Sequence, residues 1–111
     1  MTHKEALADL IAKVEAGEWP GTNILHKMND SYGFDAWCAF EGSLAAAKAL
    51  HEAVLPGWLY TIERVTGQTY RAWTNKARNL REMGFSERGP CPARAWLLVV
   101  LRALHSMEPN E

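Results

Sequence analysis

The sequence predicts a single α+β domain, in which a mainly antiparallel sheet of three to four strands packs against three main helices. Two observations indicate this fold class. Three segments have apolar residues at helical spacing, and two neighbouring segments rich in aromatic and β-branched residues are separated by a Thr-Gly turn. The expected order is helix, strand, helix, strand, strand, helix, with a short helix before the last. Residues 1–111 fit one domain, with 106–111 as a frayed tail.

The first helix is expected to begin at a capping box. Thr2 and Glu5 have the T-x-x-E spacing, in which each side chain satisfies a backbone N–H that the helix leaves unpaired. Gly17 is expected to end the helix, because glycine adopts the left-handed conformation without strain. The apolar face of this helix comprises Leu7, Leu10, Ile11 and Val14.

The next part of the chain is predicted to end in a strand. The pattern of residues 22–33 is ambiguous, although it fits a short strand around Ile24 and Leu25, followed by a turn at 29–30. Residues 34–40 alternate in the manner of a half-buried strand. One face of that strand would carry Phe34, Ala36, Cys38 and Phe40.

A second helix and a β-hairpin follow. Ser43 is a favourable N-cap, and the Pro-Gly pair at 56–57 is expected to end the helix sharply. The hairpin is predicted from strands at 58–65 and 68–74, joined by a two-residue turn at 66–67. Its aromatic rings are expected to pack mainly as cross-strand pairs.

The remaining chain is predicted to hold two helices. Asn75 is a suitable N-cap for a short helix at 76–83, and residues 85–91 read as a loop. Pro92 suits the first turn of a final helix at 93–106. That helix is apolar around most of its circumference, so we expect it to be the buried centre of the domain, packed on the sheet.

The composition is that of an ordinary soluble globular protein. Apolar residues make up 48% of the chain, charged residues 23%, and the net charge is −1. No apolar run approaches the roughly 20 residues that a membrane span requires. The first residues lack the apolar core of a secretion signal, so we expect a cytoplasmic protein with no membrane partner.

Few residues are candidates for chemistry. None of the four histidines is paired at a metal-binding spacing, so neither a metal nor another cofactor is expected. His51 is placed on the polar side of the second helix. Cys38 and Cys91 are expected to be free thiols. The sequence contains no phosphate-binding or nucleophile motif, and we expect no enzymatic activity.

The charge is unevenly distributed along the chain. Residues 1–55 carry eight acidic residues against four lysines, whereas residues 56–94 carry seven basic residues against three acidic ones. Aromatic residues are interleaved with this basic segment, which fits a solvated face, a protein-binding surface or a nucleic-acid surface. The candidate partner-binding residues are Arg64, Arg71, Trp73, Lys76, Arg78, Arg81 and Arg88.

The order of three segments resembles a known family. They are FEGSLAAAKALHEAVLPGW (40–58), WLYTIERVTGQTYRAW (58–73) and PARAWLLVVLRAL (92–104). Over roughly residues 5–105, the chain resembles the phage ABA-sandwich-domain proteins, small proteins encoded by tailed phages and prophages of proteobacteria. The resemblance implies a layered α/β arrangement and a phage accessory role in the bacterial cytoplasm. That family has no established activity, so the resemblance implies no site residues. The segment at 75–89 departs from the family, in which the hairpin leads directly to the last helix.

The resemblance and the charge pattern together favour a non-enzymatic protein that binds a host protein stoichiometrically. Its most concrete form is an inhibitor of bacterial defence, acting on a CRISPR or other defence complex in the manner of an anti-CRISPR. Either the acidic N-terminal half or the basic 64–88 segment would be the contact. One alternative is a nucleic-acid-binding regulator that uses the basic segment; another is a small-ligand binder or enzyme with an unidentified site. The surplus of aromatic rings is also compatible with a homodimer.

Overall fold

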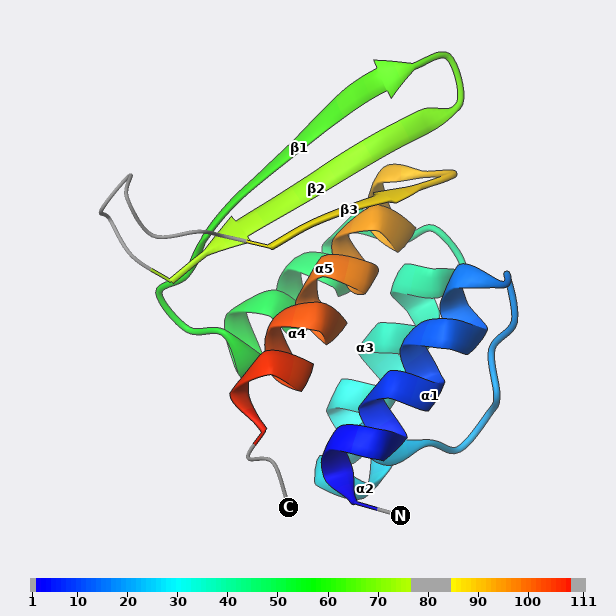
Figure 1. The fold of residues 1–111 in the computed structure, drawn as a ribbon, viewed down its shortest axis with the longest axis vertical. Helices are drawn as coiled ribbons and strands as arrows, with labels where there is room; N and C mark the ends of the chain where they lie inside the picture. The colour runs from blue at the N-terminus through cyan, green and yellow to red at the C-terminus, as the bar shows by residue number, and fades with distance from the viewer. Residues whose placement is uncertain (1, 77–84, 109–111) are drawn as a thin grey trace.

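The computed structural model describes residues 2–76 and 85–108 and shows a single α+β domain, as the sequence predicts. Within these residues there are five helices and one three-stranded antiparallel sheet in the order β1-β2-β3 (Figure 1). The helices are α1 (His3–Glu15), α2 (Ile24–Met28), α3 (Asp30–Phe40), α4 (Leu44–Val54) and α5 (Pro92–Met107). The strands are β1 (Leu59–Thr66), β2 (Thr69–Asn75) and β3 (Phe85–Gly89).

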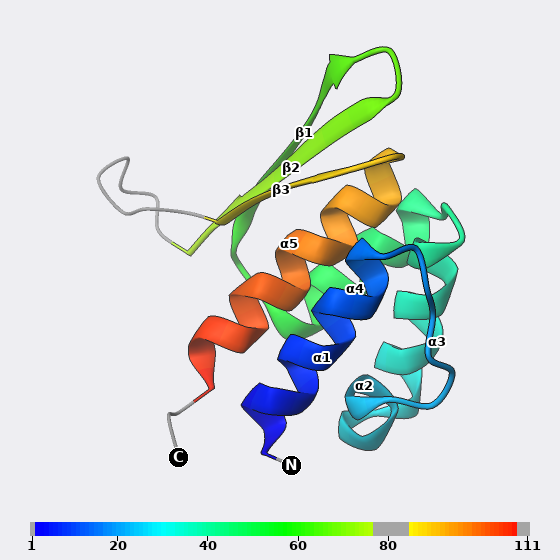
Figure 2. The ribbon, with the colours of Figure 1, turned by 45° about the vertical axis from the view of Figure 1, so that its right-hand side comes forward.

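Helix α5 lies between the sheet and the other helices (Figures 1 and 2). It contacts all three strands on one side and α1, α3 and α4 on the other. Leu97 and Leu101 on one face and Val99 on the opposite face are all fully buried. The prediction of a central buried last helix is therefore confirmed. The first two predicted helices, α1 and α4, pack against α5 instead of lying beside it on the sheet.

The predicted helix ends are present. The Thr2 hydroxyl accepts a hydrogen bond from the Glu5 backbone N–H at 3.1 Å, and the Glu5 carboxylate completes the capping box. The Ser43 hydroxyl accepts from the backbone N–H of Ala46 at 3.1 Å and caps α4. Helix α1 ends just before Gly17, whose φ of 80° is in the left-handed region.

The prediction of a strand at 34–40 is wrong, because α3 occupies this segment, and α2 stands where residues 22–33 fitted a short strand. The Asn23 side chain accepts from the Leu25 N–H at 3.0 Å and starts α2 where a strand was expected. The Asn29 side chain likewise accepts from the Ser31 N–H at 2.9 Å and starts α3 where a turn was expected. Asparagine suits both turns and helix N-caps, so the residue type did not separate the two.

Burial along α3 explains why its alternating pattern was misleading. The buried residues of this helix are Gly33, Ala36, Ala39 and Phe40, which follow helical spacing. Phe34, expected to face the core of a strand, is 60% exposed. A run of seven mostly small and apolar residues satisfies both periods, and alanine favours the helix.

The predicted hairpin is confirmed, with a shift of its turn. Strand β1 pairs antiparallel with β2, from Leu59 opposite Asn75 to Thr66 opposite Thr69. The two turn residues are therefore 67–68, one position later than predicted. The register shifts between Arg64 and Thr66, which makes the intervening residue a β-bulge near the tip.

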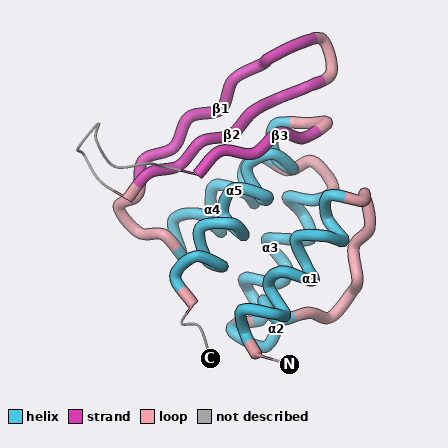
Figure 3. Tube along the Cα trace, viewed as in Figure 1, coloured by secondary structure: helices cyan, strands magenta, loops and turns pink. Residues whose placement is uncertain are grey.

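The third strand comes from the segment predicted as a loop. Strand β3 pairs antiparallel with β2, with Thr74 opposite Phe85 and Tyr70 opposite Gly89. It thus takes the place in the sheet that was expected for 34–40, and Figure 3 shows all the strands on one side of the helices. The short helix predicted at 76–83 lies outside the described residues except for Lys76, which is in a bend.

Close packing at Gly89 holds β3 against the start of α5. A Cβ atom at this position would lie 2.9 Å from the backbone nitrogen of Ala95, closer than real Cβ contacts. Because the obstacle is backbone, a side-chain rotation cannot relieve the clash. The sheet and α5 can approach this closely because residue 89 has no side chain.

We expect Gly89→Ala to lower the free energy of unfolding by about 1–3 kcal/mol, since the added methyl group overpacks this contact. Urea denaturation followed by far-UV circular dichroism measures the change. Gly67→Ala is the matched control, because a Cβ at Gly67 meets nothing within 4 Å. The control should stay within about 1 kcal/mol of the wild type. Equal effects of the two substitutions would contradict the packing argument.

Candidate functional site

The face of the sheet opposite α5 has no helix packed on it in the described part of the chain (Figures 1 and 2). Residues that are partners across antiparallel strands point to the same face. The register therefore places Glu63, Arg71 and Arg88 in one row across the three strands, with Thr61 and Trp73 in the next row. We call this surface the open sheet face. Its members are Leu59, Thr61, Glu63, Arg71, Trp73 and Arg88.

The charges of the open sheet face are partly neutralised. The Arg71 guanidinium donates a hydrogen bond to the Glu63 carboxylate, and both side chains are close to half exposed. Within residues 2–76 and 85–108, no carboxylate forms an ion pair with Arg88. Trp73 is half-buried beside the ion pair, and together with Thr61 these residues line a hollow of about 310 Å³. This face thus combines an aromatic ring, an ion pair and one available guanidinium.

The edge of the sheet continues this surface. Among the described strands, β1 pairs with β2 alone, and every residue of β1 except Ile62 is exposed. Leu59, at its start, remains 46% exposed. Edge strands leave alternate backbone N–H and C=O groups available to another chain. An incoming partner would therefore meet side chains on the face and unpaired backbone groups on the edge.

The structure brings together only part of the predicted basic set. Arg71, Trp73 and Arg88 share the open sheet face. Arg64 alternates with Glu63, so it points to the other face, and its guanidinium donates to the Gly67 carbonyl at 3.1 Å in the turn. Two further predicted residues, Arg78 and Arg81, lie outside the described residues, and Lys76 is exposed just after β2. Arg64 therefore lies apart from the three predicted residues that share the open sheet face.

A buried polar cluster, not predicted from the sequence, joins α4, α5 and the start of β1. His51 is 1% exposed, so its predicted position on the polar side of the helix is wrong. The Trp96 indole N–H donates to His51 Nδ1 at 3.2 Å, and His51 Nε2 lies 3.1 Å from the Trp58 carbonyl oxygen. The Tyr60 ring packs edge-on against the imidazole at 4.9 Å.

These hydrogen bonds fix the protonation state of His51. An indole N–H can only donate, so Nδ1 is the acceptor and carries no proton. The proton is therefore on Nε2, which donates to the carbonyl of Trp58. Burial lowers the pKa of His51 from its usual 6.5, although the hydrogen bond to Trp58 and the charge of Glu52 oppose the shift. The imidazole is a neutral structural link and has no exposed nitrogen facing a substrate.

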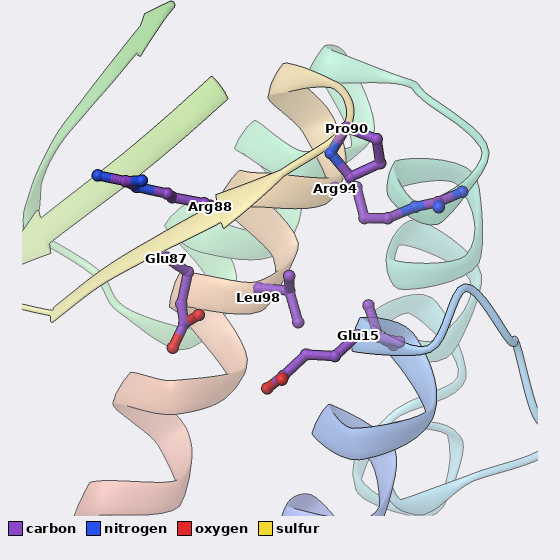
Figure 4. A pocket seen from close by; sticks show the side chains of 7 residues that line it. Glu15, Glu87, Arg88, Pro90, Arg94 and Leu98 are labelled. Atoms are coloured by element: carbon purple, nitrogen blue, oxygen red, sulfur yellow. The ribbon is translucent and has the colours of Figure 1, made fainter. Parts of the chain in front are cut away.

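A second hollow lies between the end of α1, strand β3 and α5, with a volume of about 480 Å³ (Figure 4). Glu15 and Glu87 extend into it from opposite sides. Arg102 donates to both carboxylates, at 2.6 Å to Glu15 and 2.7 Å to Glu87. One guanidinium thus connects three elements of the fold. The residues lining the hollow include no histidine, cysteine or serine, so they supply no nucleophile or imidazole base.

Arg94, at the rim of this hollow, is already engaged elsewhere. Its guanidinium donates to the Phe40 carbonyl at 3.0 Å and lies 4.1 Å above the centre of the Phe40 ring. It therefore fastens the start of α5 to the end of α3. The ion pairs and this contact give the hollow a structural role in joining helices to the sheet.

The remaining candidates for chemistry are the two cysteines and groups of metal-binding side chains. Cys38 and Cys91 are unpaired and half-buried. No group of three or more histidine, cysteine, aspartate or glutamate side chains in the described ranges is arranged to hold a metal ion. Likewise, a search of the described helices finds none with the length and apolar character needed to cross a membrane.

Comparison with known proteins adds no assignment. No protein-family model, curated protein or solved structure matches this chain. The resemblance to phage ABA-sandwich-domain proteins accordingly stays a prediction from the sequence.

We expect the stability of the protein to fall as the pH decreases through the usual histidine pKa of 6.5. Because the folded pKa of His51 is lowered, the unfolded chain binds a proton first and is favoured in this range. The loss from this residue is at most about 1.4 kcal/mol per pH unit and ends below the folded pKa. Urea denaturation between about pH 7.5 and 5.5 measures it, above the range where most carboxylates titrate.

Two variants separate His51 from the other titrating groups. His51→Gln should give a flatter dependence of unfolding free energy on pH, because its side chain does not titrate. His3→Gln replaces an exposed histidine, 3.9 Å from Glu108, and should retain the wild-type dependence. An unchanged slope in His51→Gln would show that another group is responsible.

Proposed function

We propose that this protein is a small non-enzymatic binding protein that binds a partner protein stoichiometrically through the open sheet face. The observation that supports this most is Trp73 on an uncovered sheet surface, next to Arg71 and Arg88. Tryptophan and arginine are the residue types that most often dominate the binding energy of protein interfaces. The exposed edge strand beside them offers backbone hydrogen bonds to the same partner.

The charges favour a protein partner over a nucleic acid. Nucleic-acid affinity rises with the number of phosphates that basic side chains neutralise. Here Glu63 lies at the β1 end of the row and pairs with Arg71, so a phosphate backbone would meet a carboxylate beside the two arginines. A protein surface with one acidic group opposite Arg88 and an apolar side chain over Trp73 fits this arrangement better. The occupant that we propose is therefore an acidic, partly apolar protein surface.

The resemblance to phage accessory proteins suggests where that partner is found. A phage protein of this kind would act in the cytoplasm of a bacterial host, by stoichiometric occupation and not by turnover. A host defence complex, such as a CRISPR effector, is the most concrete class of target. This step depends on analogy between families and is independent of the charge argument.

Substitutions in the open sheet face should weaken binding of the partner protein. The tagged protein is used to capture proteins from nuclease-treated bacterial lysate, and the captured protein is purified for calorimetry. We expect Trp73→Ala and Arg88→Glu each to weaken binding at least about tenfold, as substitutions at interface hot spots do. Leu44→Ala and Lys48→Glu are matched controls on α4 with exposed side chains, and they should leave the affinity unchanged.

Three results would contradict the proposal. Equal affinity of the sheet variants and the α4 controls would move the contact to another surface. Capture that disappears on nuclease treatment would support a nucleic-acid-binding regulator instead. Recovery of the chain itself as the bound protein, with a concentration-dependent mass in solution, would identify a homodimer.

A further inference from the structure

A hollow lined by aromatic rings lies in the helical layer, away from the open sheet face. Its volume is about 450 Å³, and its rings are Trp19, Phe34 and Trp37. Trp19 belongs to the segment between α1 and α2, which runs alongside α3 in Figures 1 and 2. Asp30 and His26 also line the hollow. We call it the aromatic hollow.

The rings of the aromatic hollow are accessible. Phe34 is 60% exposed and Trp37 is 44% exposed, both large values for such side chains. Their ring centres are 6.2 Å apart and their planes meet at 58°, so they form two walls at an angle instead of a closed stack. Ring faces that are not stacked on each other remain available to a ligand.

The other side of the hollow, formed by His26 and Trp19, is held in place by close contacts. A Cβ atom at Gly33 would lie 2.3 Å from the His26 ring, so this imidazole packs directly on the α3 backbone. His26 Nδ1 also accepts from the Asn23 N–H at 3.3 Å. Trp19 is fixed by the Phe40 ring, with 5.6 Å between ring centres. Little reorganisation is therefore needed before a ligand binds.

The charge of the hollow is negative. Asp30 is exposed, and within the described residues no basic side chain forms an ion pair with it. The nearest lysine in sequence, Lys27, lines a different hollow together with residues of α1. Aromatic faces and a carboxylate both attract cations, and an alkylated ammonium group can also bury its methyl groups against the rings.

We propose that the aromatic hollow binds a quaternary ammonium group, such as that of a small choline-type compound. The positive charge rests against the faces of Phe34 and Trp37, and Asp30 supplies the opposite charge. The volume leaves room for the chain that carries the ammonium group. This site does not depend on the proposed protein-binding role, because it shares no residue with the open sheet face.

The test is a titration of the full chain with choline, in which tryptophan fluorescence and amide chemical shifts report binding. The neutral isostere 3,3-dimethylbutan-1-ol has the same shape without the charge. We expect choline to bind saturably and several-fold more tightly than the isostere, as cation–π attraction requires. Phe34→Ala, Trp37→Ala and Asp30→Asn should each weaken binding by about threefold or more. Leu44→Ala, which removes an exposed apolar side chain on α4, should bind as the wild type does.

Equal affinity for choline and the isostere would overturn the proposal, because the hollow would then be only an apolar surface. Absence of saturable choline binding would overturn it too, as would variants of the hollow that bind like the wild type. Circular dichroism confirms that each variant is folded, and because Phe34 and Trp37 are exposed, their truncation removes little core packing. A parallel titration with a trimethyl-lysine peptide distinguishes a free small molecule from a modified protein as the source of the group.

Discussion

The burial of α5 on all sides is the constraint on which the rest of the structure depends. Each of its large apolar side chains gains roughly 1.5–3 kcal/mol when removed from water, but only if something covers it. Leu97 and Leu101 are fully buried, and no single neighbouring layer could cover them together with Val99. The sheet covers one side of this helix and α1, α3 and α4 cover the other. Among the described residues, the sheet and these helices therefore pack mainly against α5, and they contact each other little.

This arrangement also determines which surfaces are left for binding. One face of the sheet packs on α5. In the described part of the chain no helix covers the other face, which carries Trp73 and the ion pair of Arg71. On the opposite layer, α3 packs its small residues inward and leaves Phe34 and Trp37 outside. The two aromatic surfaces thus arise from the same layering, on opposite sides of the molecule.

Elements with local signals could be predicted from the sequence, whereas those fixed by distant contacts could not. The capped helices, the hairpin and the buried α5 have such signals in their own residues. Segment 34–40 satisfies two periods, and tertiary packing decided in favour of the helix. Strand β3 is mostly polar, and pairing with β2 creates it. For the candidate site, the strand register puts Trp73 and Arg71 on one face, whereas the burial of His51 depends on Trp96 of α5, which is 45 residues away in the chain.

Helix α5 follows every other described element in chain order, and this position has a consequence for biosynthesis. A ribosome makes α1, α3, α4 and the strands before it makes the segment that they pack against. Until Pro92–Met107 emerges, α1, α3 and α4 lack the helix that covers part of their apolar surface, and that surface stays exposed in the growing polypeptide. Folding of this domain is therefore a late, cooperative event that completes only after nearly all of it has been translated.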